Sequence, residues 1–144
     1  MKILFICRGN VGRSQMAEAL FNKEANGEIE AISAGTKLSG PEQPIEEIVP
    51  NVNIGDVIEV MREEGLDISK NIRKQLTKEM ADSADKIILT IDERDQIPNY
   101  LIGNPKVIKW HVIDPKGQSL EFTRKSRDQI KGLIKSLIKD ISNN

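Results

Sequence analysis

The segment Cys7-Arg8-Gly9-Asn10-Val11-Gly12-Arg13-Ser14 contains the single cysteine of this 144-residue chain. Gly9 and Gly12 allow the backbone to turn several N–H groups inward around an anion. Arg13, six residues after Cys7, can then bind two oxygens of a tetrahedral oxyanion. Ser14 can hydrogen-bond the sulfur and favour its thiolate form, which is the nucleophilic form. The segment therefore predicts phosphate chemistry at a cysteine.

The sequence on either side places this segment between a strand and a helix. The apolar run at residues 2–6 predicts a buried central strand that ends at Cys7. Residues 13–27 carry a helical apolar stripe, made of Met16, Ala17, Leu20 and Phe21. A helix that begins here directs free N–H groups and partial positive charge at a bound anion. We therefore expect the nucleophile Cys7 to be surrounded by substrate-binding residues, namely Arg8, Gly9, Asn10, Val11, Gly12 and Ser14.

The rest of the chain alternates predicted strands with predicted helices. Strands are predicted at residues 28–33, 86–91 and 106–110, and residues 33–36 are expected to close the first of them with a turn. Helices are predicted at about residues 57–65, from Thr77 onward and at 130–141, while residues 37–53 read as a long loop. This order predicts one α/β domain over residues 1–144, a three-layer, flavodoxin-like open sheet of four parallel strands with helices on both faces. Residues 7–14 and 111–117 then share the carboxyl edge of the sheet, where such folds bind ligands.

Composition narrows the range of partners. The net charge is −1 with 30% charged residues of both signs, so no overall field draws the chain to nucleic acid or to an acidic membrane. One cysteine and one histidine exclude an internal disulfide framework and a Cys/His zinc cluster. The N-terminal apolar run is too short for a signal peptide, and no stretch reaches the roughly 20 apolar residues of a membrane span. We expect a soluble cytoplasmic protein that needs no cofactor.

A general acid is the second chemical requirement. Attack by Cys7 on a phosphate ester expels an alkoxide or phenoxide, which leaves faster when a carboxylic acid protonates it. Asp114 is the first choice, because its loop leaves a strand at the binding edge of the sheet and Pro115 stiffens the backbone that presents it. Asp92, at the end of the third predicted strand, competes for the role. Asp-Pro is also an ordinary turn pair. His111 is expected to be a structural or surface histidine, and the Ser33 hydroxyl is expected to support the neighbouring loop if the first two strands are adjacent.

These residues together suggest a family. Cys7-x5-Arg13-Ser14, with Gly9-Asn10 inside it, resembles the phosphate loop of the low-molecular-weight protein tyrosine phosphatases and of the arsenate reductases that share their fold. Residues 16–18, 33–36, 65–69, 86–92 and 114–115 are similar to further family landmarks in family order, so the resemblance spans nearly the whole chain. It implies the phosphotyrosine phosphatase I-like fold, with Cys7 as nucleophile, Arg13 as oxyanion clamp and Asp114, rather than Asp92, as general acid and then base. It also implies that the supporting residues are Asn10, Ser14 and Ser33.

Several positions differ between the two branches of this family. Phosphatases usually carry a second cysteine where Gly12 stands, and often aromatic residues where Lys116-Gly117 follows the Asp-Pro pair. Gln15 and Trp110 are similar to the arsenate reductases, some of which hold a potassium ion at the positions of Asn10, Glu18, Ser33 and Asp67. Thioredoxin-coupled reductases use two further cysteines after the third strand, and residues 92–98 contain none. A reductase would therefore require an external thiol or redoxin.

The sequence thus predicts a cysteine-dependent phosphomonoester hydrolase, similar to a protein tyrosine phosphatase, that forms a phosphocysteine intermediate. Hydrolysis needs only Cys7, Arg13, Asp114 and water. The alternative is an arsenate reductase that uses Cys7 and an external thiol or redoxin. A third interpretation is a non-catalytic anion sensor or a cysteine phosphocarrier, and Asp114 argues against it because a carboxylate that activates water would hydrolyse the phosphocysteine.

Overall fold

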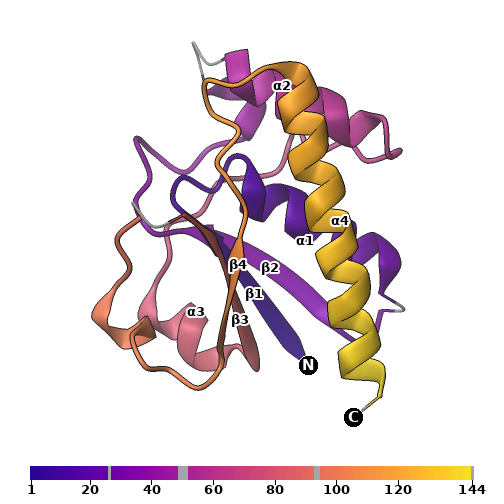
Figure 1. Cartoon of the computed structure of the whole chain (residues 1–144). Helices are drawn as coiled ribbons and strands as arrows, with labels where there is room; N and C mark the ends of the chain where they lie inside the picture. The colour runs from indigo at the N-terminus through magenta and orange to yellow at the C-terminus, as the bar shows by residue number, and fades with distance from the viewer. Residues whose placement is uncertain (26, 49–51, 93–94, 144) are drawn as a thin grey trace.

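A four-stranded parallel sheet organises the chain, as the computed structural model of residues 1–25, 27–48, 52–92 and 95–143 shows (Figure 1). The strands are β1 (Lys2–Cys7), β2 (Glu30–Gly35), β3 (Lys86–Ile91) and β4 (Val107–His111). The helices are α1 (Arg13–Glu24), α2 (Val52–Arg62), α3 (Lys78–Ser83) and α4 (Leu120–Ser142), with short 3-10 turns η1 (Ile45–Glu47) and η2 (Asn99–Leu101). Within these described ranges no helix combines the length and the apolar character that crossing a membrane demands.

The strand order places the end of β1 at a ligand-binding position. The order is β2-β1-β3-β4, and the pairs β1–β2, β1–β3 and β3–β4 are parallel. The chain leaves β1 for β2 on one side and then crosses to β3 on the other side of β1. The carboxyl end of β1 therefore lies at the point where the strand order reverses, and open α/β sheets bind ligands at that point.

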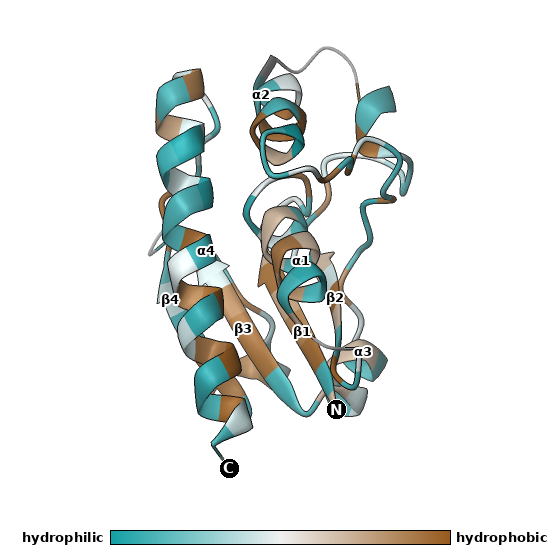
Figure 2. Cartoon of the chain, turned by 90° about the vertical axis from the view of Figure 1, so that its right-hand side faces the viewer, coloured by the Kyte–Doolittle hydropathy of each residue, from teal (hydrophilic) through white to brown (hydrophobic). Residues whose placement is uncertain are grey.

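The residues of β1 alternate between two apolar layers. Ile3 and Phe5 pack with residues of α1, α2 and α4, and the Phe5 ring lies 5.7 Å from that of Trp110. Leu4 and Ile6 pack on the opposite face with residues of α3 and η2. The two central strands, β1 and β3, are hydrophobic beyond their first residues, and the outer side of α4 is largely hydrophilic (Figure 2). Both faces of the sheet are covered, which confirms the predicted fold class.

Three predicted boundaries were wrong in informative ways. β2 spans Glu30–Gly35 rather than residues 28–33, because its in-register pairing with β1 continues to the pair Cys7 and Gly35. Residues 33–35 are thus strand, not turn. α2 begins at Val52, inside the segment predicted as a loop, since Ile54 extends its buried stripe by a turn, and η1 also lies in that segment. Residues 49–51 of that predicted loop lie outside the described residues.

The ends of α3, β4 and α4 follow local chemistry. The predicted helix start at Thr77 is confirmed, because its Oγ1 accepts a hydrogen bond from the Met80 N–H at 3.2 Å. β4 lies one residue later than predicted. α4 starts ten residues before the predicted stripe, at Leu120, with Ser119 as its cap. The buried side chains of its first turns are polar, which hid them from a search for apolar periodicity: Thr123, Ser126 and Arg127.

An ion-pair network joins α4 to the end of α2. Arg127 is buried, and its Nη1 donates to the Val60 carbonyl at 2.9 Å and to Glu63 Oε1 at 2.6 Å. Arg124 donates to the same carboxylate, with Nη2 to Oε2 at 2.7 Å. Hydrogen bonds from Arg124 and Arg127 lower the pKa of Glu63 from its ordinary 4.5 to about 2.

This network gives a testable dependence of stability on pH. Since the folded-state pKa of Glu63 lies below the unfolded value, its contribution is fully present above about 4.5 and is lost as the pH falls toward about 2. In Glu63→Gln, urea unfolding followed from about pH 7 down to about pH 3 should show a weaker fall in stability than in the wild type. The matched control Glu59→Gln removes an exposed carboxylate from α2 and should follow the wild-type profile. Identical profiles for Glu63→Gln and the wild type would contradict the assignment.

Candidate active site

Cys7 ends β1, and its thiol is surrounded by hydrogen-bond donors. The Asn10 N–H donates to Cys7 Sγ at 3.3 Å, and Ser14 Oγ lies 2.9 Å from the same sulfur. Asn10 Nδ2 donates to Ser14 Oγ at 2.8 Å, so the Ser14 hydroxyl proton is free to point at the sulfur. Cys7 itself is 3% exposed. The sulfur thus lies among hydrogen-bonding groups at the floor of the loop formed by residues 7–14, which we call the phosphate loop.

Asn10 locks the shape of the phosphate loop. Its φ of 55° is in the left-handed region, which asparagine tolerates better than most residues. Its Oδ1 accepts hydrogen bonds from Gln15 Nε2 at 3.2 Å and from the Lys74 N–H at 2.8 Å. Its Nδ2 also donates to Ser33 Oγ on β2 at 3.0 Å. Ser33 therefore contacts the loop from the neighbouring strand, at the place where the sequence led us to expect it.

Gly35 lets the end of β2 approach the phosphate loop closely. A Cβ at this position would lie 2.7 Å from the Arg8 carbonyl oxygen and 3.0 Å from the Asn10 nitrogen. Both neighbours are backbone atoms, so they move only if the loop moves. The Thr36 and Lys37 N–H groups then donate to the carbonyls of Cys7 and Arg8, each at 2.9 Å, and fix the two segments together.

Gly35→Ala should therefore reduce activity without touching a side chain of the site. Displacing a catalytic loop by a fraction of an ångström to 1 Å lowers rates substantially, and we expect kcat/KM for an aryl phosphate to fall about 100-fold. Gly132→Ala is the matched control, since the Cβ it would add on α4 meets no atom within 4 Å apart from the neighbouring backbone of its own helix. That control should keep full activity and melt at the same or a higher temperature. Full activity in Gly35→Ala would show that the close approach has no functional role.

Arg13 holds its guanidinium among three acceptors. It is the first residue of α1 and 2% exposed. Its Nη1 donates to the Val112 carbonyl at 3.2 Å and to Asp95 Oδ2 at 3.4 Å, and its Nη2 lies 3.5 Å from Asp114 Oδ2. The Lys116 N–H in turn donates to Asp114 Oδ1 at 3.0 Å. The structure thus brings the predicted clamp and the predicted acid into one ion pair.

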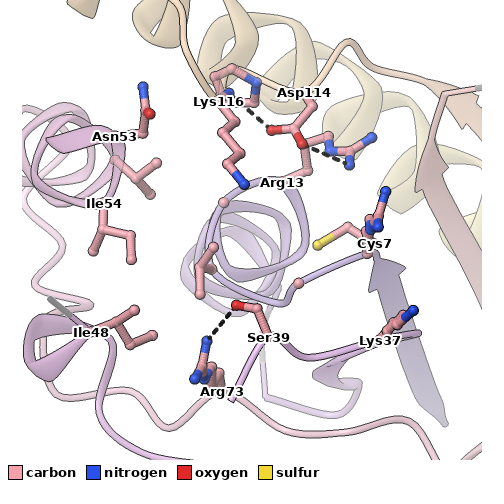
Figure 3. A pocket seen from close by; sticks show the side chains of 16 residues that line it. Cys7, Arg13, Lys37, Ser39, Ile48, Asn53, Ile54, Arg73, Asp114 and Lys116 are labelled. Carbon is pink, nitrogen blue, oxygen red and sulfur yellow. Dashed lines mark hydrogen bonds and ion pairs between the residues drawn. The ribbon is translucent and has the colours of Figure 1, made fainter. Parts of the chain in front are cut away.

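Cys7, Arg13 and Asp114 line one pocket (Figure 3). Arg8, Gly9, Val11 and Gly12 also line it, as predicted for the substrate-binding backbone. Asn10 and Ser14 do not line it: both are fully buried behind the loop and act on its shape and on the sulfur. The remaining lining residues come from four other segments of the chain: Lys37, Ser39, Ile48, Asn53, Ile54, Val57, Arg73, Pro115 and Lys116.

The other candidates of the sequence lie outside this pocket. Asp114 is the only carboxylate among the described residues that line it, so Asp92, the competing acid, is not part of the lining. The Asp92 N–H donates instead to Asp95 Oδ2 at 3.0 Å. His111 is exposed on β4, and its carbonyl accepts a hydrogen bond from Gln129 Nε2. These placements agree with the preference for Asp114 and with a structural or surface role for His111.

Three of the four residues predicted for a potassium site lie together. Asn10 Nδ2 donates to Ser33 Oγ, and Ser33 lies near enough to Glu18 to influence the pKa of that carboxyl. Burial raises the pKa of Glu18, while Lys74 and Ser33 oppose that effect. Asp67 is exposed and accepts a hydrogen bond from the Ser69 N–H at 2.9 Å, which helps to lower its pKa. Potassium binding at these residues stays a prediction.

Sequence reasoning missed three residues of the site. Asp95 contacts Arg13 but stands in a segment noted only for its lack of cysteine. Arg73 is buried at the pocket, far along the chain from the phosphate loop. Gly35 was assigned to a turn. The one available signal was the position of Asp95 just beyond the carboxyl end of β3, at the same edge of the sheet as the phosphate loop.

Comparisons with known proteins agree with this geometry. The chain is 31% identical to the glutaredoxin arsenate reductase of Synechocystis sp. over 141 residues, which cover 98% of each protein. It is 28% identical to the protein-arginine-phosphatase of Bacillus subtilis, over 98% of the chain and 97% of that protein. A cysteine-to-serine mutant of the YwlE arginine phosphatase with a phosphorylated active-site serine superimposes with a TM-score of 0.81 at 28% identity, covering 100% of this chain and 97% of the other.

A family model confirms the predicted family. The model for low molecular weight phosphotyrosine protein phosphatase matches residues 2–144, so the match includes every residue placed in the pocket. Both enzyme classes expected from the sequence, phosphatase and arsenate reductase, occur among the relatives. The chain belongs to the low molecular weight phosphotyrosine protein phosphatase family.

Proposed function

We propose that this chain hydrolyses phosphate monoesters, with Cys7 as nucleophile, Arg13 as oxyanion clamp and Asp114 as general acid and then base. The observation that carries the proposal is the meeting of Cys7, Arg13 and Asp114 in one pocket, with Asp114 3.5 Å from Arg13, in a chain that has no second thiol. The related YwlE mutant with a phosphorylated active-site serine supports phosphoryl transfer to the side chain at the nucleophile position.

In the first step the Cys7 thiolate attacks phosphorus opposite the ester oxygen. The S–P bond forms as the P–O ester bond breaks, and the Asp114 carboxylic acid gives its proton to the departing oxygen. The N–H groups of the phosphate loop and the Arg13 fork bind the three non-bridging oxygens, whose charge they stabilise in the transition state. The products of this step are an alcohol or phenol and phosphocysteine.

In the second step water replaces the sulfur. Asp114, now a carboxylate, takes a proton from the attacking water, the new P–O bond forms and the S–P bond breaks. Ser14 and the Asn10 N–H stabilise the thiolate that leaves, which restores the starting site. A cysteine phosphocarrier would instead need to preserve the phosphocysteine, and Asp114, which could activate water against it, lines the same pocket.

Arsenate reduction is the second candidate, favoured by the relatives named as arsenate reductases. Arsenate has the shape and charge of phosphate, so the same loop and Arg13 suit it. Reduction of arsenate to arsenite consumes two electrons, which two thiols supply by forming a disulfide. This chain holds one cysteine, so Cys7 would need an external thiol or a redoxin as its partner. For the phosphatase, the proposed substrate is a phosphoprotein. The proposed location is the cytoplasm, because a reducing compartment keeps the single buried thiol in its reduced form.

A paired assay separates the two activities. One preparation is tested for hydrolysis of p-nitrophenyl phosphate and for arsenate reduction with glutathione and glutaredoxin. We expect ester hydrolysis that depends on Cys7, and little arsenite. Arsenite formation without ester hydrolysis would reject the phosphatase proposal and support the reductase. Phosphate binding without either reaction would support the sensor.

A further inference from the structure

The active-site pocket has a strong excess of positive charge. Its described lining includes one carboxylate, Asp114, and five cationic side chains: Arg8, Arg13, Lys37, Arg73 and Lys116. The whole chain has 21 basic and 22 acidic residues, so this excess is local. The reaction proposed above uses only Arg13. The other four cations need a separate explanation.

Arg73 is the most constrained of these cations. It is 3% exposed, its Nε donates to the Pro41 carbonyl at 2.8 Å and its Nη1 donates to Ser39 Oγ at 3.5 Å (Figure 3). Gly40 makes room for it, because a Cβ there would lie 2.6 Å from Nη2. Within the described part of the chain, no carboxylate forms an ion pair with it. A buried guanidinium without a counter-charge is costly, so the fold holds in place a positive charge that an anion from outside can neutralise.

Lys37 and Arg8 extend the positive surface beyond the pocket. Their segments are joined by the hydrogen bond from the Lys37 N–H to the Arg8 carbonyl. Both side chains also line a neighbouring hollow, together with Thr36 and Gln96, which add a hydroxyl and an amide. Lys116 reaches toward the pocket from the opposite side (Figure 3). The cations thus surround the place where the group attached to the phosphoryl must lie.

The uncharged part of the pocket fits a side chain with an apolar stem. Ile48, Ile54 and Val57 form an aliphatic wall, and no aromatic residue is among the described lining residues. A phosphorylated side chain can rest its stem on this wall while its phosphoryl group reaches Cys7. The residues next to it in the substrate then pass close to Arg73 and Lys37.

We propose that the preferred substrate carries further negative charge next to the phosphoryl group, and that Arg73 and Lys37 form the anion subsite that binds it. The occupant is an acidic segment of a phosphoprotein, with glutamate or aspartate beside the phosphorylated residue. A small molecule with two phosphates presents the same chemistry from another source. This inference rests on the proposed phosphatase function and specifies its substrate class.

The test compares phosphotyrosyl peptides that differ only in two flanking residues, Glu-Glu or Gln-Gln. Wild-type kcat/KM should be about tenfold higher for the glutamate peptide than for the glutamine peptide, a ratio that a few partly exposed ion pairs can supply. This preference should shrink as salt is added, because salt screens exposed charges. Lys37→Glu should bring the ratio close to one. Lys135→Glu makes the same charge change on the exposed side of α4 and should preserve the ratio. Arg73→Gln should also reduce the ratio of kcat/KM for the two peptides. If Arg73→Gln fails to fold, Lys37→Glu still tests the anion subsite, because Lys37 is exposed.

Additional measurements distinguish a failure of the anion subsite from a failure of the proposed phosphatase activity. Binding of both peptides to Cys7→Ser gives an affinity ratio that needs no turnover, and the same tenfold preference is expected. A ratio of one in the wild type, with p-nitrophenyl phosphate still hydrolysed, would reject the anion subsite and leave the phosphatase intact. If both peptides are equal but a hexose bisphosphate is preferred over the monophosphate, the phosphoprotein occupant is wrong. If nothing is hydrolysed, the proposed function fails and the binding ratio still decides the subsite.

Discussion

Cys7→Ser is expected to lower kcat for p-nitrophenyl phosphate by at least about 10⁴-fold, the size of effect seen when a covalent nucleophile is removed. In this position the sulfur contacts the Ser14 hydroxyl and the Asn10 N–H, and hydrogen bonds of this kind suit a thiolate nucleophile. A serine hydroxyl ionises far less readily, and the only carboxylate in the described pocket lining, Asp114, is needed in its acid form for the same step.

The loss should come from chemistry and not from the fold. A serine hydroxyl is smaller than the thiol, and it can form the same hydrogen bonds with Ser14 and the Asn10 N–H. The melting temperature of Cys7→Ser should therefore lie close to that of the wild type. Inorganic phosphate should bind it with an affinity within about threefold of the wild type, because the loop N–H groups and Arg13 remain. Turnover within tenfold of the wild type would show that Cys7 is not the nucleophile.

Asp114→Asn should give the second largest effect, and the effect should depend on the leaving group. For phenyl phosphate, whose leaving oxygen needs a proton, kcat/KM should fall by about 10³-fold. For p-nitrophenyl phosphate, whose leaving group is stable as an anion, kcat/KM should fall much less, because this parameter reports the steps up to the first bond cleavage. The ratio of the two losses is the signature of a general acid.

Two matched variants show whether the effect belongs to Asp114. Asp140→Asn makes the same change on the exposed side of α4 and should leave both substrates unaffected. Asp92→Asn tests the competing acid, and since Asp92 does not line the pocket we expect no dependence on the leaving group. If the leaving-group-dependent loss appears in Asp92→Asn and is absent from Asp114→Asn, the general-acid assignment is wrong.

The features that the sequence predicted well are those encoded in neighbouring residues. The first strand, the loop and the first helix were predicted from the apolar run that ends at Cys7 and from its spacing to Arg13. The parallel sheet was predicted from the alternation of strands and helices along the chain, and the structure confirms it. Asp114 was selected over Asp92 by resemblance, because spacing along the chain carries no information on which of two strand ends faces the loop. The pocket lining, which includes Asp114, agrees with that choice.

The features that it missed depend on contacts between distant segments. Gly35 is needed because β2 runs beside the phosphate loop backbone, and that requirement appears only once the register of β1 and β2 is known. Asp95 contacts Arg13, which lies 82 positions away in the sequence. Arg73 contacts Ser39, which lies 34 positions away. Neither belongs to a periodic pattern, so only the folded chain shows that Asp95 contacts Arg13 and that Arg73 lines the same pocket as Cys7.

The central claim, phosphoryl transfer to Cys7, is tested most directly by rapid quench of Asp114→Asn with p-nitrophenyl phosphate. The first step needs no acid with this leaving group, while the second lacks its base, so the intermediate should accumulate. We predict a burst of one nitrophenol per molecule of enzyme, with a phosphoryl group found by mass spectrometry on the peptide that contains Cys7. Steady turnover without a burst, or a phosphoryl group on any other residue, would contradict the account.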